Sequence, residues 1–221
     1  LQAMTALISA ENISILRGQH LIIRQASLDI PAGQAIHLIG ENGSGKTTLL
    51  QALAGLLPIS AGNIIRHSEL LYLGHRAGIK GLLSVTENLY MAARLYHGMN
   101  KTAAHAAIPQ ALAQMGIAHL AQRQARHLSA GQQRRVQLAR LWLPSPALWL
   151  LDEPLTALDI KTAAVLAAHC ENHIDKGGAI LLTSHQHFPM TANKLRQIDL
   201  SDLSPAQSIA GANHDWDEDS F

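Results

Sequence analysis

The sequence has a single cysteine, few aromatic residues and little net charge, and each of these absences excludes a class of protein. Cys170 alone cannot form an internal disulfide or a thiolate metal cluster, so we expect it to be a small buried apolar side chain in a reducing compartment. Aromatic residues make up 4% of the chain, which argues against surfaces that stack nucleic-acid bases. The formal net charge of +1 gives no electrostatic basis for binding a polyelectrolyte. We therefore expect no nucleic-acid partner.

Long apolar runs are also missing. No stretch approaches the roughly 20 residues that a membrane-spanning helix needs, and no basic segment precedes an apolar one at the N-terminus, so we expect neither a span nor a signal peptide. The thirteen histidines are scattered without an H-E-x-x-H or Cys/His grouping, and we expect most of them to be incidental. What is present is 48% apolar residues over 221 positions, enough for one large domain or a domain with a subdomain.

Strands and helices alternate along most of the chain. The strands after the first two β-rich stretches are continuously apolar, which is typical of a parallel sheet covered on both faces. A helix is expected from the Gly-rich loop after residue 40 to about Gly55, and another over 162–175. The expected strands and β-rich stretches are 5–16, 20–30, 34–40, 69–75, 147–151 and 179–185.

The stretch from about Gly78 to His127 is different, because it lacks strand patterns. Ser84 with Glu87 forms a capping box that opens a helix to about His97. An Ala-rich helix follows over 101–115, and we expect Pro109 to interrupt it. These features predict an all-helical insertion.

We therefore expect one domain over 4–205, with a helical subdomain at about 78–140. The remaining segment, 206–221, is acidic and expected to be mobile.

A phosphate-binding loop follows the strand at 34–40. The segment "GENGSGKT" matches G-x-x-x-x-G-K-[ST] between a strand and a helix. Glycines let the backbone turn its N–H groups toward phosphate oxygens, and the helix adds its positive end. Lys46 would reach the β- and γ-phosphates, and Thr47 would offer its hydroxyl to Mg²⁺. The expected binding residues are Gly40, Glu41, Asn42, Gly43, Ser44, Gly45, Lys46, Thr47 and Thr48.

Two carboxylates end the apolar strand at 147–151. Asp152 and Glu153 would face the crevice where ligands bind in α/β sheets. We expect Asp152 to hold Mg²⁺ through water, and Glu153 to polarise an attacking water. Two solvated acids at a strand end are the alternative interpretation.

A second turn opens on a helix at "LSAGQ", residues 128–132. Ser129 and Gln132 form a capping box, which a plain helix start would also use. Its glycine, Gly131, and the positive end of the helix could instead meet a phosphate.

Taken together, these motifs resemble the nucleotide-binding domains of ABC transporters over about residues 5–190. "LSAGQ" is similar to the family's signature motif, with Ala130 where Gly is commoner. The resemblance implies an α/β P-loop NTPase fold with a mainly parallel core sheet, an antiparallel β subdomain and an inserted helical subdomain. It also implies that two copies pair head to tail around two ATP molecules, with Ser129, Gly131 and Gln132 of one copy on the ATP of the other.

The resemblance gives further residues a role. Glu153 would be the catalytic base of ATP hydrolysis, and His185 in "LTSHQ" would contact the γ-phosphate, with a core or surface histidine as the alternative. Asp159 in "LTALD" would lie at the dimer seam or simply cap a helix.

Two positions depart from the family pattern. Arg17 stands where an adenine-stacking aromatic is usual, so guanidinium stacking and weak base discrimination are expected. His75 stands in place of the Gln expected near Mg²⁺, which leaves its part in metal binding open.

Within the family, "LYLGHRAGIKGLLSVTENL" and "LSAGQQRRVQLARLWL" resemble the ATP-binding subunits of bacterial cytochrome c maturation systems, which export haem. This resemblance implies polytopic inner-membrane partner subunits, an indirect link to a haem chaperone, and a peripheral location on the cytoplasmic face of the inner membrane. The open alternatives are an ABC subunit for another cargo, a soluble ABC ATPase outside transport, and a regulatory module that binds ATP without turnover.

Overall fold

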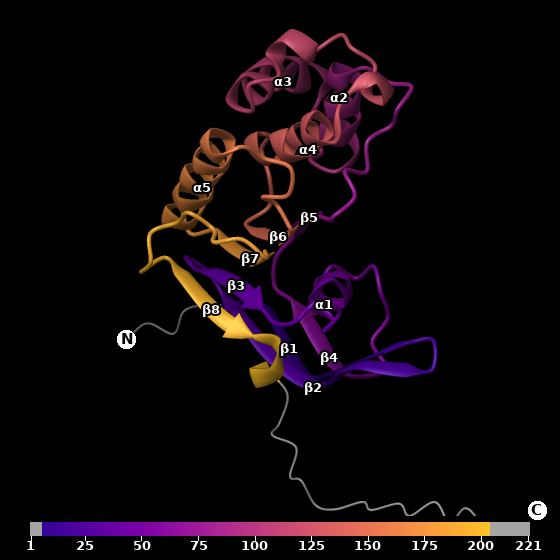
Figure 1. Ribbon diagram of the computed structural model, residues 1–221, viewed down its shortest axis with the longest axis vertical. Coiled ribbons are helices and arrows are strands. Elements are labelled where there is room, and N and C mark those ends of the chain that lie inside the picture. The colour runs from indigo at the N-terminus through magenta and orange to yellow at the C-terminus, as the bar shows by residue number, and fades with distance from the viewer. Residues whose placement is uncertain (1–5, 204–221) are drawn as a thin grey trace, which may run out of the picture.

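The computed structural model describes residues 6–203, whose strands form two sheets (Figure 1). A five-stranded sheet has the order β5-β6-β7-β3-β8, and every neighbouring pair in it is parallel. A three-stranded sheet has the order β2-β1-β4 and is antiparallel. The expected fold class is confirmed. The segment 206–221, expected to be an acidic mobile tail, lies outside the described residues.

The element boundaries follow the expected pattern closely. The strands are β1 (Ala6–Arg17), β2 (His20–Pro31), β3 (Ala35–Ile39), β4 (Ala61–Arg66), β5 (Leu70–Leu73), β6 (Leu148–Asp152), β7 (Ala179–Thr183) and β8 (Leu195–Asp199). The α-helices are α1 (Lys46–Leu53), α2 (Val85–Leu95), α3 (Lys101–Gln114), α4 (Ala130–Leu138) and α5 (Ile160–Asp175).

The inner strands β6 and β7 of the parallel sheet are almost entirely apolar because each face packs on its own core. Along β6, Leu148 and Leu150 face a core shared with α1 and the antiparallel sheet. Trp149 and Leu151, on the opposite face, belong to a second core that includes α5. Cys170 of α5 is fully buried in this second core, as expected, and burial raises the pKa of its thiol.

Helices α2, α3 and α4 gather at one end of the molecule, away from α1 and the antiparallel sheet (Figure 1). Their apolar side chains, such as Leu89, Ile108 and Val136, join the core that covers the α5 face of the parallel sheet. The helical segment is thus continuous with the sheet through its core, and its division from the rest as a subdomain stays a prediction. None of the helices within residues 6–203 is long and apolar enough to cross a bilayer.

The expected interruption at Pro109 is wrong, because α3 is continuous from Lys101 to Gln114. Pro109 lies on the exposed face of the helix, where the carbonyl group that it leaves without a donor can be hydrated. On the opposite face Ala104, Ile108 and Leu112 are buried, and their packing holds the two halves in one helix.

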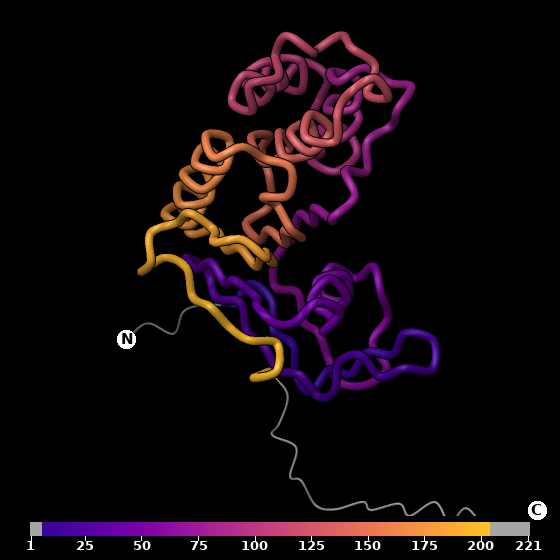
Figure 2. Tube along the Cα trace, in the orientation of Figure 1, coloured from indigo at the N-terminus to yellow at the C-terminus, as the bar shows by residue number. Residues whose placement is uncertain are grey.

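Two strands have no clear signal in the sequence. β4 is mostly exposed and β8 is only partly buried, so neither shows an apolar run or a clean alternation. Tertiary pairing defines them: β4 pairs with β1, and β8 pairs in parallel with β3 (Figure 2), which brings the C-terminal strand beside the first strand of the core sheet.

Candidate functional site

The site lies where four neighbouring strands of the parallel sheet end. The loops after β3, β5, β6 and β7 all leave from the same edge, because parallel strands point their carboxyl ends the same way. They surround an open pocket of about 360 Å³. The residues that line it are Arg17, Asn42, Gly43, Gly45, Lys46, Thr47, Thr48, His75, Glu153, Thr156, Thr183 and His185.

The phosphate loop between β3 and α1 has the backbone that its glycines allow. Gly43 has φ 80° and Gly45 has φ 107°, which other residues rarely adopt. A Cβ on Gly45 would lie 2.7 Å from a methyl carbon of Ile22, so this turn also packs closely on β2. The Lys46 Nζ atom donates to the carbonyl oxygens of Gly40 and Glu41, both at 2.8 Å, and is thereby held across the mouth of the loop.

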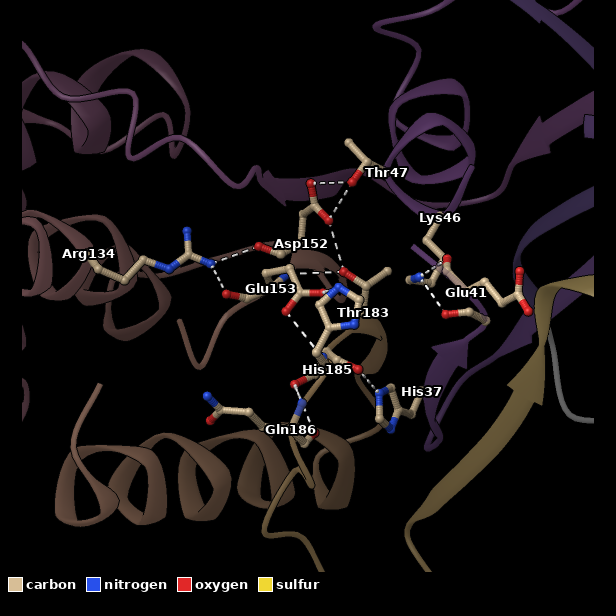
Figure 3. A network of polar contacts seen from close by, with 12 residues as sticks. His37, Glu41, Lys46, Thr47, Arg134, Asp152, Glu153, Thr183, His185 and Gln186 are labelled. Carbon is tan, nitrogen blue, oxygen red and sulfur yellow. Dashed lines mark hydrogen bonds and ion pairs between the residues drawn. The ribbon is translucent and has the colours of Figure 1, made fainter. Parts of the chain in front are cut away.

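Thr47 and Asp152 bring hard oxygen ligands together beside this loop. The Thr47 hydroxyl lies 3.0 Å from each carboxylate oxygen of Asp152 (Figure 3). Such donors suit Mg²⁺, which usually takes one or two protein oxygens and completes its shell with phosphate and water. No cluster of three or more His, Cys, Asp or Glu side chains able to hold a metal occurs in residues 6–203.

Glu153 and His185 come from neighbouring strands and meet in the pocket. The Nε2 atom of His185 lies 3.3 Å from one carboxylate oxygen of Glu153, and the backbone N–H of His185 donates to the other at 3.3 Å. The Glu153 side chain is 15% exposed, whereas His185 is 55% exposed. The carboxylate is thus shielded, whereas more than half of the His185 side chain is exposed.

Arg17 and His75 line the same pocket. Arg17 is the last residue of β1 and is exposed, so its guanidinium is free to lie over a base. His75 follows β5, and its backbone carbonyl is close to the buried Arg134 guanidinium. Both residues that depart from the family pattern therefore face the expected nucleotide site.

The signature residues lie elsewhere, along a second open pocket of about 490 Å³. Ser129 accepts from the N–H of Gln132, and Gln132 accepts in return from the N–H of Ser129, which confirms the capping box at the start of α4. A Cβ on Gly131 would lie 2.8 Å from the carbonyl oxygen of Ala157, so the turn packs against the segment that leads to α5. Of the expected site residues, this pocket contains Ser129, Gly131, Gln132 and Asp159.

Asp159 caps α5, which was the alternative to its place at the dimer seam. Its carboxylate accepts from the N–H of Thr162 at 2.8 Å, and this bond is the main cause that lowers the pKa of Asp159. It also forms an ion pair with Arg135 of α4. The cap and a seam contact are compatible, because the Asp159 side chain is 55% exposed.

Three buried polar residues beside the site were missed from the sequence: His37, Arg134 and Thr183. His37 bonds through Nε2 to the carbonyl of Ser184 at 3.0 Å, and burial lowers its pKa. Arg134 and Thr183 bond to the main chain around Glu153. His37 and Thr183 are polar residues in apolar strands, and that contrast is the signal the sequence offers for them. Arg134 lies in a polar helix and gives no such signal.

The fold and pocket together define a P-loop nucleoside triphosphatase. Comparison of the sequence with known families and proteins identifies the family within this class. The model of the ABC transporter family matches residues 23–156. A cytochrome c biogenesis ATP-binding export protein, CcmA, from Vibrio cholerae is 40% identical over 209 residues, which cover 89% of this chain and 99% of that protein. A protein of the same name from Yersinia pestis is 41% identical over 216 residues, with 92% and 97% covered. The chain belongs to the ABC transporter family and is one of its ATP-hydrolysing subunits.

A solved structure of an ATP-binding subunit of an ABC transporter has the same fold. Its TM-score is 0.74 at 23% identity, and the match covers 81% of this chain and 79% of that one.

Proposed function

We propose that two copies of this chain pair head to tail and hydrolyse ATP at two shared sites. The observation that carries this proposal is the separation of the site residues into two pockets. One contains the phosphate loop, Glu153 and His185, and the other contains Ser129 at the start of α4. A second copy would bring Ser129 and the positive end of α4 to the γ-phosphate.

Each residue of the phosphate-loop pocket then has a role. The main-chain N–H groups of residues 43–47 and the Lys46 ammonium would bind the β- and γ-phosphates, and Thr47 and Asp152 would hold Mg²⁺. The ion would neutralise charge on the phosphates when bound. Glu153 would accept the proton of the attacking water, and His185 would donate a hydrogen bond to the γ-phosphate. Asp159 would meet the partner beside this site.

Mixing two inactive variants tests the shared site. Lys46→Ala removes the phosphate contact, while Ser129→Asp keeps a good N-cap and places a negative charge against the γ-phosphate. Each variant alone should be inactive. When the two variants are mixed in equal amounts and pair at random, about a quarter of the sites combine an intact phosphate loop with an intact signature turn. Activity should therefore return. If Ser129→Asp alone hydrolyses ATP normally, Ser129 is only a cap and the shared site is wrong.

We further propose that the ATPase serves cytochrome c maturation, with haem as the cargo and polytopic inner-membrane subunits as partners. This proposal is supported by curated relatives that are about as long as this chain and carry that name. It places the chain on the cytoplasmic face of the inner membrane and connects it indirectly with a haem chaperone.

Affinity purification of this chain from detergent-solubilised membranes of its host tests the cargo. A polytopic protein together with a haem-loaded chaperone that leaves on ATP hydrolysis is the expected result, read from the haem absorbance band with and without ATP. A permease without haem would overturn the haem assignment and leave the ATPase mechanism in place.

A further inference from the structure

We propose that Thr183 and Arg134 are positioning residues that hold Glu153 in the backbone conformation from which its carboxylate reaches the attacking water. The inference rests on the proposed role of Glu153 as the base. The sequence motifs assign no role to either residue, although Thr183 lies in "LTSHQ" and Arg134 follows "LSAGQ". Both are almost completely buried, at 1% and 5% exposed.

Glu153 has an unusual backbone. Its φ is 52°, in the left-handed region that side chains with a Cβ rarely adopt. Such a conformation persists only where surrounding contacts determine it, and Pro154, which follows, has no N–H to contribute. Within the turn, the N–H of Thr156 donates to the Glu153 carbonyl at 3.2 Å, and the remaining contacts come from other segments of the chain.

Thr183 supplies the contact on the amide side. Its Oγ1 atom accepts from the backbone N–H of Glu153 at 3.0 Å and donates to a carboxylate oxygen of Asp152 at 2.9 Å (Figure 3). A threonine hydroxyl has one proton, so donation to Asp152 leaves its lone pairs for the Glu153 amide. One buried hydroxyl thus fixes the geometry of both acidic residues.

Arg134 supplies the contact on the carbonyl side. Its Nη2 atom donates to the carbonyl oxygens of Asp152 at 2.8 Å and of Glu153 at 2.6 Å (Figure 3). Its Nη1 atom donates to the carbonyl of Gly74 at 2.9 Å and to the side chain of Gln137. A planar guanidinium can bridge these groups, whereas the single ammonium of a lysine could not match the same fork of acceptors.

The carboxylate of Glu153 is the part that remains for chemistry. The N–H of Glu153 donates to Thr183, and its C=O accepts from Arg134. The side chain of Glu153 projects toward His185. A displacement of about 1 Å of a catalytic group can cost about 100-fold in rate, so loss of either contact should slow the chemical step.

Thr183→Val and Thr183→Ser form a matched pair. Valine has nearly the same shape and lacks the hydroxyl, whereas serine keeps it. We expect Thr183→Val to lower kcat by about 10- to 100-fold with KM for ATP changed little, and Thr183→Ser to stay within about threefold of wild type. A merely structural hydroxyl would change the unfolding temperature without this split between kcat and KM. Equal kcat values for the two variants would overturn the inference, as would a loss confined to KM.

A double-mutant cycle with Glu153→Gln separates this inference from the proposed function. If Thr183 acts through Glu153, Thr183→Val lowers the single-turnover rate by a smaller factor in the Glu153→Gln background than in the wild-type background. Full additivity would overturn the inference. If Glu153→Gln alone hydrolyses ATP normally, the proposed role of Glu153 fails. If Glu153→Gln is inactive while Thr183→Val is fully active, only the positioning role fails.

Arg134→Lys extends the test to the carbonyl side. It keeps the charge and loses the bridge, so we expect a fall in kcat with ATP affinity retained. Because the Arg134 side chain is buried, the unfolding temperature of the Arg134→Lys protein is measured together with that of the Thr183→Val protein, to check that both are folded. A folded Arg134→Lys protein with wild-type kcat would remove Arg134 from the inference.

Discussion

The Nε2 atom of His185 lies 3.3 Å from the carboxylate of Glu153, and the His185 amide donates to the same group. The two residues follow β7 and β6, which are neighbours in the parallel sheet. The proposed base and the proposed γ-phosphate ligand are thus paired within one chain, before any second copy contributes.

Substitution of Glu153 by Gln should remove turnover and leave ATP-induced pairing intact. Glutamine keeps the shape of the side chain but cannot accept the proton, a loss of about 100-fold or more in a general-base step. The measurements are phosphate release and the mass of the particle by light scattering with and without ATP. Hydrolysis at the wild-type rate would show that another group is the base.

Discrimination between ATP and GTP should be weak. Arg17 offers a guanidinium face, whose stacking depends little on which base it meets. Dissociation constants for the two nucleotides should agree within a few-fold, and Arg17→Ala should raise both by about fivefold, equivalent to ~1 kcal/mol of stacking. Titration calorimetry with Glu153→Gln, which is not expected to consume the ligand, measures both. Affinity for ATP far above that for GTP would contradict this role of Arg17.

A methyl group on Gly131 should be harmful, although the neighbouring Ala130 already has one. The new Cβ would lie 2.8 Å from the carbonyl oxygen of Ala157, a contact that only a backbone shift can relieve. We expect Gly131→Ala to lower the free energy of unfolding by ~1–3 kcal/mol and to reduce ATPase activity.

The control for Gly131→Ala is Ala130→Gly, which restores the commoner family residue without adding an atom. Chemical denaturation and steady-state hydrolysis compare the two variants. Similar stability for both would show that the contact with Ala157 relaxes easily.

The folded chain should become less stable as the pH falls below about 6.5. Burial lowers the pKa of His37, His97, His169 and His173 in the folded state. An unfolded histidine titrates at about 6.5, so from there down to the lowered folded pKa the unfolded chain binds protons that the folded chain does not. The stabilisation gained by burying these histidines in the neutral form is complete above the unfolded pKa of about 6.5. It is lost as the pH falls toward the folded pKa. Thermal unfolding at pH 7.5 and 5.5 measures it.

His169→Phe should make this pH dependence shallower. The imidazole stacks on Trp142 with ring centroids 4.0 Å apart, and a phenyl ring can occupy the same place without a proton to gain. His67→Gln is the control, because His67 is exposed. An unchanged slope in His169→Phe would contradict the assignment of the effect to this histidine.

The parts of the site that could be predicted are those in which one short stretch determines its own geometry. The phosphate loop follows from glycines between a strand and a helix, and the strand end places Asp152 beside Thr47. The helix starts at Ser84 and Ser129 were predictable for the same reason, since a capping box closes within four residues.

The parts that were missed depend on segments that meet only in the folded chain. Thr183 is a polar residue at the end of an apolar strand. The groups that it bonds lie at the end of the neighbouring strand β6, so its role is visible only in the folded chain. Arg134 joins α4 to the ends of β5 and β6, which are far apart in sequence. β8 is a strand because β3 offers a free edge, not because of its own residues.

Ser129 is the N-cap of helix α4, and Arg134 lies just over one turn further along the helix. In the proposed pair, Ser129 would serve the nucleotide of the other copy, while Arg134 is bonded to the main chain of Glu153 in its own copy. Any tilt of this short helix would therefore reach both nucleotides at once. The helix would thereby connect the nucleotide bound by one copy with the proposed base of the other site.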